Sequence, residues 1–133
     1  TLLANVLLRQ QAVEQNCAEA ILIKDGYAIE GAASNLFIVS ENVLITPPKN
    51  ADILAGITRE VIIQLAQDNN MACVEQPITE TALLQASEIW LTSSTKEILP
   101  VIQLNNKVVG TGEIGTVWHT MNTLFQHTKR AVS

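Results

Sequence analysis

The sequence predicts a mixed α/β domain, in which a hairpin-rich sheet is flanked by helices. Short apolar segments separated by turn residues predict strands, and apolar residues at intervals of three and four predict helices. The 133 residues suit one domain, and a content of 47% hydrophobic and 16% charged residues indicates a substantial buried core. No repeat, linker or low-complexity segment divides the sequence, so we expect a single domain over residues 1–133.

The first half of the chain predicts one helix and two hairpins. Apolar residues between Leu2 and Val13 recur at helical spacing and predict a helix over residues 2–16. Asp25-Gly26 is a strong signal for a two-residue hairpin turn. The hairpins that we expect join residues 20–23 to 27–29 through Asp25-Gly26, and residues 36–39 to 43–45 through Ser40-Glu41-Asn42.

The second half predicts three helices interleaved with short strands. The first helix follows Gly56-Ile57-Thr58 and ends at residues 68–70, with a buried stripe of Val61, Ile62, Leu65 and Ala66. A short helix over residues 80–86 has Thr79 as its expected cap. The expected strands cover residues 73–74, 88–92, 98–104 and 107–109. The closing helix has the clearest apolar face, formed by Ile114, Val117, Trp118, Met121, Leu124 and Phe125.

Charge and composition exclude several classes of protein. The net charge is −5, with 8 Lys and Arg against 13 Asp and Glu, so there is no basic patch for nucleic acid or for an anionic membrane surface. No apolar run approaches the roughly 18–20 residues that span a bilayer. Cys17 and Cys73 predict two buried thiols in a reducing cytoplasm. His119 and His127 lack a third ligand nearby, so we expect solvated helix residues and no metal.

Glu30 stands at the end of an apolar strand and is followed by small residues, from Gly31 to Ser34, before the next strand begins. One reading is a surface carboxylate at a strand end. The other is a carboxylate that faces a ring nitrogen and keeps it protonated through a charge-assisted hydrogen bond. A protonated pyridine ring is an electron sink, as pyridoxal phosphate chemistry requires.

The second segment with a chemical reading is Gly56-Ile57-Thr58, at the start of a predicted helix. Gly56 permits close backbone approach, and the amides of Ile57 and Thr58 can bind an anion at a helix N-terminus. The alternative is an ordinary helix capped by its threonine. We expect Arg59 and Glu60 to be surface charges of this helix.

The third segment consists of four consecutive hydroxyl residues, Thr92 to Thr95, directly after an apolar strand. These residues are either a polar turn or part of a phosphate cradle made of hydroxyls and backbone amides. The sequence contains no glycine-rich nucleotide loop and no nucleophile elbow.

Taken in order, these segments resemble the C-terminal half of class IV aminotransferases, which are pyridoxal-phosphate enzymes of fold type IV. The matching blocks are residues 2–7, 30–37, 54–59, 92–101 and 112–125. The resemblance implies the large C-terminal domain of that fold, a sheet or pseudo-barrel with flanking helices. Ser34-Asn35 and residues 92–97 look more like D-amino-acid transaminases than branched-chain transaminases.

The resemblance also implies roles for individual residues around pyridoxal phosphate. Glu30 would contact the pyridine nitrogen, and Leu54 would pack beneath the ring. The phosphate would be bound by Ile57 and Thr58, with Ser93 and Ser94 in reach and Thr95 close behind. The remaining expected contacts are Ser34 and Asn35 at the ring edge and Ala32 and Ala33 beside the substrate.

In this family the Schiff-base lysine lies just upstream of the position of Thr1, so we expect it and the N-terminal domain to be absent from this chain. Its own lysines do not occupy that position; Lys96, beside the hydroxyl residues, is a remote substitute. We expect the chain alone to be inactive. The complete homodimeric enzyme would move an amino group between an amino acid, such as D-alanine, and a 2-oxo acid. The alternatives are an aminodeoxychorismate lyase, which eliminates pyruvate, and a non-catalytic remnant that serves as a binding or dimerisation module.

Overall fold

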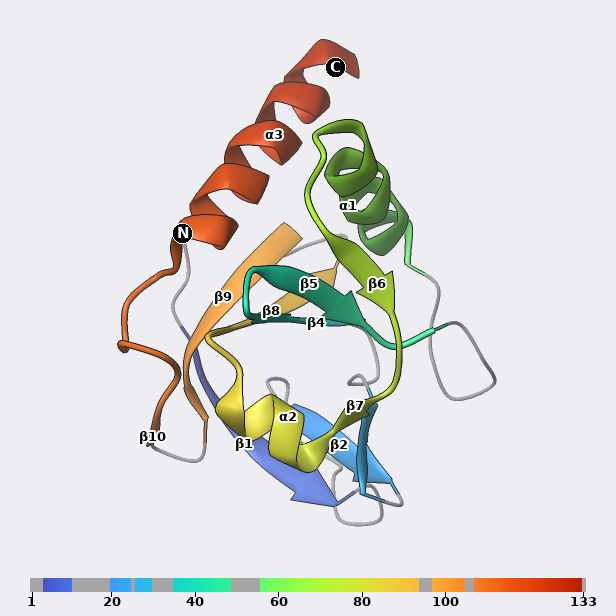
Figure 1. Cartoon of the computed structure of the whole chain (residues 1–133). Helices are drawn as coiled ribbons and strands as arrows, with labels where there is room; N and C mark the ends of the chain where they lie inside the picture. The colour runs from blue at the N-terminus through green and yellow to red at the C-terminus, as the bar shows by residue number, and fades with distance from the viewer. Residues whose placement is uncertain are drawn as a thin grey trace.

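The computed structural model describes residues 4–10, 20–24, 26–29, 35–48, 56–93, 97–104 and 107–132, which form a mixed sheet with three helices (Figure 1). The strands are β1 (Ala4–Gln10), β2 (Ala20–Lys24), β3 (Tyr27–Ile29), β4 (Asn35–Ser40), β5 (Val43–Thr46), β6 (Cys73–Glu75), β7 (Ile78–Thr79), β8 (Glu88–Ser93), β9 (Glu97–Leu104) and β10 (Lys107–Val108). The helices are α1 (Ile57–Asp68), α2 (Glu80–Gln85) and α3 (Thr116–Val132).

The strands pair in the order β6-β5-β4-β8-β9-β1-β2-β3-β7, and β10 pairs with β9. The two end strands of this path, β6 and β7, are separated along the chain by Gln76 and Pro77 alone. The sheet must therefore curl, and in Figure 1 β6 continues into β7 along one side of the molecule. Within the described residues β6 and β7 are not paired, so the curled sheet is not a closed barrel.

The helix expected over residues 2–16 is wrong for its described part, because Ala4–Gln10 forms strand β1. This strand lies between β9 and β2 and is parallel to both neighbours. Strands inside parallel ladders carry continuous apolar runs instead of alternating ones. Val6, Leu7 and Leu8 form such a run. A continuous apolar run this short fits a buried strand or a helix equally well, so its spacing alone does not distinguish the two.

Both predicted hairpins are confirmed. Strands β2 and β3 pair antiparallel, and Gly26 at the turn has φ +81°. Strands β4 and β5 also pair antiparallel, with Ser40 opposite Val43. Their turn therefore has two residues, Glu41 and Asn42, and not the three expected. Both have positive φ, 52° and 63°, as a two-residue turn between twisted strands requires.

The three later helices and the strands expected between them also follow the prediction, whereas β7 was not expected. Helix α1 ends at Asp68, and Ile62 and Ala66 of its expected stripe are buried. Helix α2 is capped by Thr79, whose Oγ1 accepts a hydrogen bond from the Ala82 amide at 3.0 Å. Helix α3 buries Trp118 and Met121. No helix in the described part is long and apolar enough to cross a membrane.

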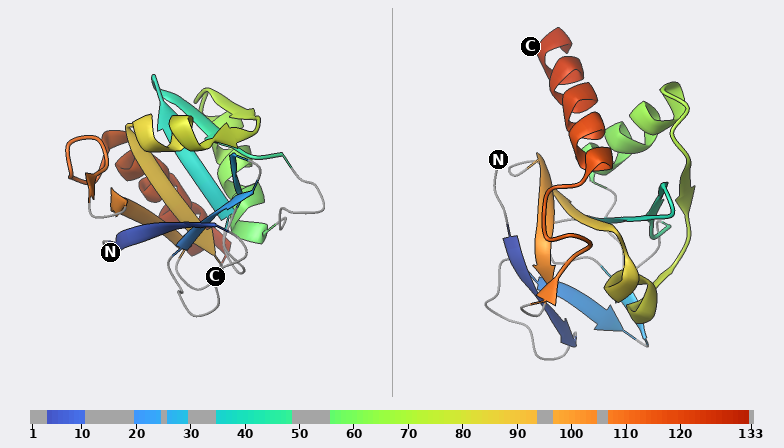
Figure 2. Two further views of the ribbon diagram at one scale, coloured as in Figure 1. Left: turned by 90° about the horizontal axis from the view of Figure 1, so that it is seen from below. Right: turned by 60° about the vertical axis from the view of Figure 1, so that its left-hand side comes forward.

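Successive side chains of the central strands point to opposite faces of the sheet, so the core has two layers, one on each face. The inner layer contains Ile89 and Leu91 of β8, and Leu83 of α2 packs against it. The outer layer contains Trp90 of β8, and it packs against α1 through Ile62 and against α3 through Trp118. Figure 2 shows α1 and α3 together at one end of the molecule, away from β1 and β2.

Candidate functional site

Helix α1 begins without a side-chain cap. Its N-cap residue is Gly56, with φ −74° and ψ 152°, which has no side chain that could accept a hydrogen bond from the first turn. The first amides of a helix have no intrahelical acceptor, and they carry the positive end of the helix dipole. The side chain of Ile57 is 83% exposed, whereas Thr58 is buried. An uncapped helix start of this kind is suited to bind an anion.

Asn35, the first residue of β4, holds this helix start in place. Its Oδ1 accepts a hydrogen bond from the Gly56 amide at 3.2 Å. A Cβ atom at position 56 would lie 2.5 Å from that same oxygen, a distance that real Cβ atoms do not adopt. The glycine is therefore needed for close contact between the loop backbone and β4, and not for an unusual φ angle.

Thr58 connects the same helix start to the end of β8. Its Oγ1 donates a hydrogen bond to the backbone oxygen of Ser93 at 3.3 Å. Together with the bond from Gly56 to Asn35, this contact brings β4, α1 and β8 to one point. Asn35, Gly56, Thr58 and Ser93 were each predicted site residues, and the structure brings all four together.

Thr92 adds a buried hydroxyl beside this point. It lies opposite Asn35 in the β4–β8 ladder, so both side chains are on the sheet face of Phe37 and Trp90, which α1 and α3 cover. Thr92 is 1% exposed, and within the described residues its Oγ1 has no hydrogen-bond partner. A buried hydroxyl without a partner costs about 1–3 kcal/mol. A polar ligand at this place would reduce that cost.

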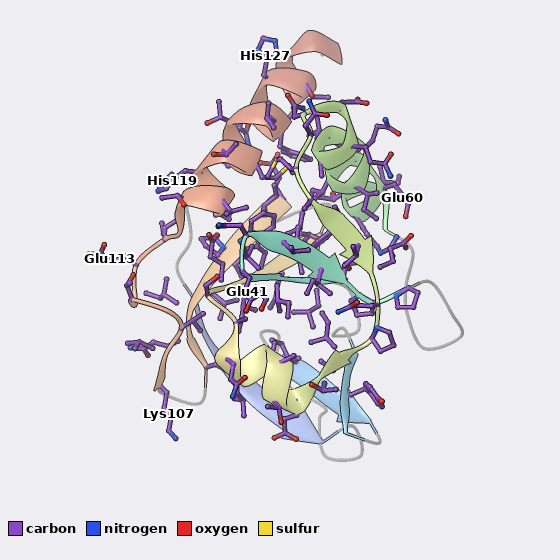
Figure 3. The ribbon with its side chains drawn as sticks, in the orientation of Figure 1. Glu41, Glu60, Lys107, Glu113, His119 and His127 are labelled. Atoms are coloured by element: carbon purple, nitrogen blue, oxygen red, sulfur yellow. The ribbon has the colours of Figure 1, made fainter. Side chains whose placement is uncertain are left out.

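Arg59 corrects the expectation of a surface charge, because its side chain is fully buried. Its Nη2 donates to the backbone oxygen of Pro47 at 2.8 Å and to Glu75 Oε1 at 2.5 Å, and its Nη1 donates to Glu60 Oε2 at 2.5 Å. Glu60 and Glu75 remain half-exposed, and Glu60 extends from α1 in Figure 3. The sequence contained a signal, since Arg59 precedes the buried residues Ile62 and Ala66 at helical intervals.

The charges of Arg59 and Glu75 also affect the pKa of the Cys73 thiol at the start of β6. Burial and the negative charge of Glu75 raise the pKa of the Cys73 thiol, and the positive charge of Arg59 partly opposes the rise. The thiol is therefore protonated at neutral pH, and the predicted burial of Cys73 holds in part, since the residue is half-buried.

The roles of all the predicted site residues remain predictions, and seven of these residues lie outside the described part of the chain: Glu30, Ala32, Ala33, Ser34, Leu54, Ser94 and Thr95. His119 and His127 are exposed on the side of α3 that faces away from α1, which confirms them as solvated helix residues (Figure 3).

The described part of the site has three features that suit a phosphate group. It combines a helix N-terminus without a side-chain cap, a glycine packed against the Asn35 side chain, and a buried Thr92 hydroxyl that has no hydrogen-bond partner among the described residues. Backbone amides and hydroxyls bind phosphate oxygens directly.

Comparison with known proteins gives a consistent family. The model for amino-transferase class IV matches residues 1–104, so α3 lies outside the match. A D-alanine aminotransferase from Bacillus licheniformis is 38% identical over 126 residues, which cover 95% of this chain and 44% of that protein. The branched-chain amino acid aminotransferase of Escherichia coli has a TM-score of 0.78 at 36% identity, over 81% of this chain and 37% of that one.

An aminotransferase from Brucella abortus, solved with its cofactor PLP bound, has a TM-score of 0.74 at 26% identity, over 81% of this chain and 38% of that one. The chain therefore spans less than half the length of each of these relatives.

Proposed function

The chain belongs to the class IV amino-transferases, and from this premise we propose that it carries the phosphate-binding part of a pyridoxal-phosphate-dependent transaminase. The complete protein would move an amino group between an amino acid and a 2-oxo acid. One observation carries the proposal: the hydrogen bonds from Gly56 to Asn35 and from Thr58 to Ser93 join three separate segments at the uncapped start of α1.

When bound, pyridoxal phosphate supplies an electron sink for the bonds at the substrate Cα. The residues of this chain would bind and orient it. The amides of Ile57 and Thr58 and the end of β8 would bind the phosphate, while Asn35 fixes the helix start through Gly56. Glu30 would hold a proton on the pyridine nitrogen. The phosphate contacts would anchor the ring so that its reacting carbon stays at a fixed place.

For the substrate, we propose a D-amino acid such as D-alanine with a 2-oxo acid as acceptor. The similarity to a D-alanine aminotransferase over 95% of the chain supports this, and the structural likeness to a branched-chain amino acid aminotransferase supports branched-chain substrates instead. The test is an amino-donor profile of the complete protein with 2-oxoglutarate as acceptor. Faster turnover with D-alanine than with L-leucine supports the proposal. A preference for L-leucine would overturn the D-specificity, and pyruvate release from aminodeoxychorismate would make the protein a lyase.

We further propose that the Schiff-base lysine and the N-terminal domain lie in another part of the complete protein, that the complete enzyme is a homodimer, and that it acts in the cytoplasm. The first point is supported by the length of the relatives, of which this chain matches 37–44%. Peptide mapping after borohydride reduction of the cofactor-loaded protein tests the lysine. A modified lysine within residues 1–133 would contradict the proposal. Light scattering tests the dimer.

A further inference from the structure

Helix α3 contacts the antiparallel pair of β8 and β9, and the end of β8 lies at the proposed phosphate subsite. We propose that Glu97, Gln126 and Lys129 are positioning residues, which hold the end of β8 and thereby the start of α1 in the geometry that binds phosphate. This inference rests on the proposed function, since it concerns how the same subsite is kept in shape.

The backbone of Glu97 is in an unfavourable conformation. Its φ is +58°, in the left-handed region that disfavours residues other than glycine and asparagine, and it is the first residue of β9. Such conformations persist where surrounding contacts hold them, and they concentrate at functional sites. Glu97 is the cross-strand partner of Ser93, so its backbone conformation determines where the end of β8 lies.

Two residues of α3 hold the Glu97 side chain. Gln126 Nε2 donates to Glu97 Oε1 at 2.8 Å, and Lys129 Nζ forms an ion pair with Glu97 Oε2. These hydrogen bonds, from Lys129 first and Gln126 second, lower the pKa of the Glu97 carboxyl, so that it is ionised at neutral pH. The next residue is held as well, because Trp118 Nε1 donates to the backbone oxygen of Ile98 at 3.1 Å.

The other end of α3 is bound to the other end of the same hairpin. Glu88, the first residue of β8, accepts hydrogen bonds from the amides of Val117 at 3.1 Å and Trp118 at 2.9 Å. The helix segment from Val117 to Lys129 is roughly 18 Å long, and β8 from Glu88 to Ser93 is roughly 17 Å long. The helix is therefore attached at both ends of the β8–β9 pair, through Glu88 at one end and Glu97 at the other.

From Glu97 a continuous set of contacts leads to α1. Ser93 pairs with Glu97 across the ladder, and its backbone oxygen accepts the hydrogen bond from Thr58 Oγ1. Thr58 lies in the first turn of α1, whose amides form the anion site. Loss of the contacts from α3 would loosen Glu97, then the end of β8, and then the side-chain anchor of this first turn.

The experiment compares pyridoxal 5′-phosphate with pyridoxal, which lacks the phosphate, by equilibrium dialysis against the complete protein. The variant Gln126→Leu with Lys129→Met removes both contacts of Glu97, and Lys129 is 57% exposed, so the single variant Lys129→Met serves if the double variant unfolds. The matched control is Lys107→Met, which removes the same charge from exposed strand β10. Thermal unfolding of each variant checks that the fold is intact.

We expect the double variant to bind pyridoxal 5′-phosphate about fivefold more weakly, the size of effect that ion-pair and hydrogen-bond losses produce, with pyridoxal binding and the control unchanged. In a Thr58→Val background the same change should have no further effect, because the connection to α1 is already broken. Equal losses for both ligands, or full additivity with Thr58→Val, would overturn the inference and leave the proposed function intact. If the unmodified complete protein binds both ligands equally, the proposed function and this inference both fail.

Discussion

The side-chain oxygen of Asn35 accepts a hydrogen bond from the Gly56 amide at 3.2 Å, across 21 positions of the chain. The same oxygen fills the place that a Cβ at Gly56 would need. A larger residue at position 56 would therefore require the buried Asn35 side chain to move, and with it the contact that positions the helix start. Because α1 has no side-chain cap, the contact fixes amides that a phosphate can use.

Gly56→Ala should displace the start of α1 and weaken binding of pyridoxal 5′-phosphate about tenfold. The added Cβ must push Asn35 or the loop aside, which costs about 1–3 kcal/mol in a packed site. Titration with the cofactor and urea unfolding measure the two effects. Adding Asn35→Ala removes the clashing oxygen, so unfolding free energy should partly recover in the double variant. A single variant with unchanged affinity and stability would show that the contact does not constrain the site.

Arg59→Met should lower the free energy of unfolding by about 3 kcal/mol, because it leaves the Pro47 backbone oxygen without its donor inside the protein. Glu60 and Glu75 are half-exposed and can regain water, which keeps the loss at the lower end for a buried charge. Arg59→Lys should lower the free energy of unfolding by less, since the lysine ammonium can keep one of the three contacts that the guanidinium makes. Lys107→Met is the charge-matched control. The free energies of unfolding are measured by urea denaturation. A value for Arg59→Met within about 0.5 kcal/mol of the control, which is the usual scatter of surface substitutions, would contradict this account.

Glu88→Gln should destabilise the protein by about 1–2 kcal/mol, as the loss of a helix cap does. The carboxylate accepts from the amides of Val117 and Trp118 and from Trp90 Nε1, and one amide oxygen cannot replace both carboxylate oxygens. A Cβ at Gly115 would lie 2.1 Å from the Glu88 carboxyl carbon, so Gly115→Ala should act in the same direction. The control is Glu113→Gln, an exposed carboxylate just before α3 (Figure 3). Equal melting temperatures for the Glu88 and Glu113 variants would disprove the cap.

Cys73 should react slowly with iodoacetamide at pH 8, because burial and Glu75 raise the pKa of its thiol. Glu75→Gln removes the negative charge and should accelerate alkylation, measured by mass spectrometry in a Cys17→Ser background. A raised thiol pKa in the folded state also means that the neutral thiol favours folding below the unfolded pKa, and that this contribution is lost as the pH rises through the folded pKa. Alkylation of Cys73 at the rate of a free thiol would contradict the assigned burial.

The sequence alone was sufficient for elements whose signal is local. Turn residues around Gly26 predicted the first hairpin, and the 3.6-residue period predicted the buried face of α3. Strand β1 was missed because its apolar run reflects two parallel neighbours that are distant in sequence.

At the site, the residue types of Asn35, Gly56, Thr58 and Ser93 could be selected in advance, but their contacts could not. The bond from Gly56 to Asn35 depends on how β4 and β8 pair and where α1 packs, which no local pattern encodes. Arg59 was misjudged for the related reason that its two carboxylate partners and the Pro47 oxygen come from three different segments. Glu60 is adjacent to Arg59 in the sequence, but Pro47 and Glu75 are 12 and 16 positions away, so the local charge pattern does not show that Arg59 is buried.

Amide chemical shifts of the ¹⁵N-labelled chain, recorded with pyridoxal 5′-phosphate and with pyridoxal, test the central claim most directly. We predict that the phosphate-bearing ligand shifts the amide signals of Ile57 and Thr58 at the uncapped start of α1, and that pyridoxal does not. The amide of Ala82 is the internal control, since it lies in the first turn of α2 and already donates to Thr79 Oγ1. Unchanged signals for Ile57 and Thr58 at saturating ligand, or the same shifts with pyridoxal, would contradict the assignment of this helix start as the phosphate subsite.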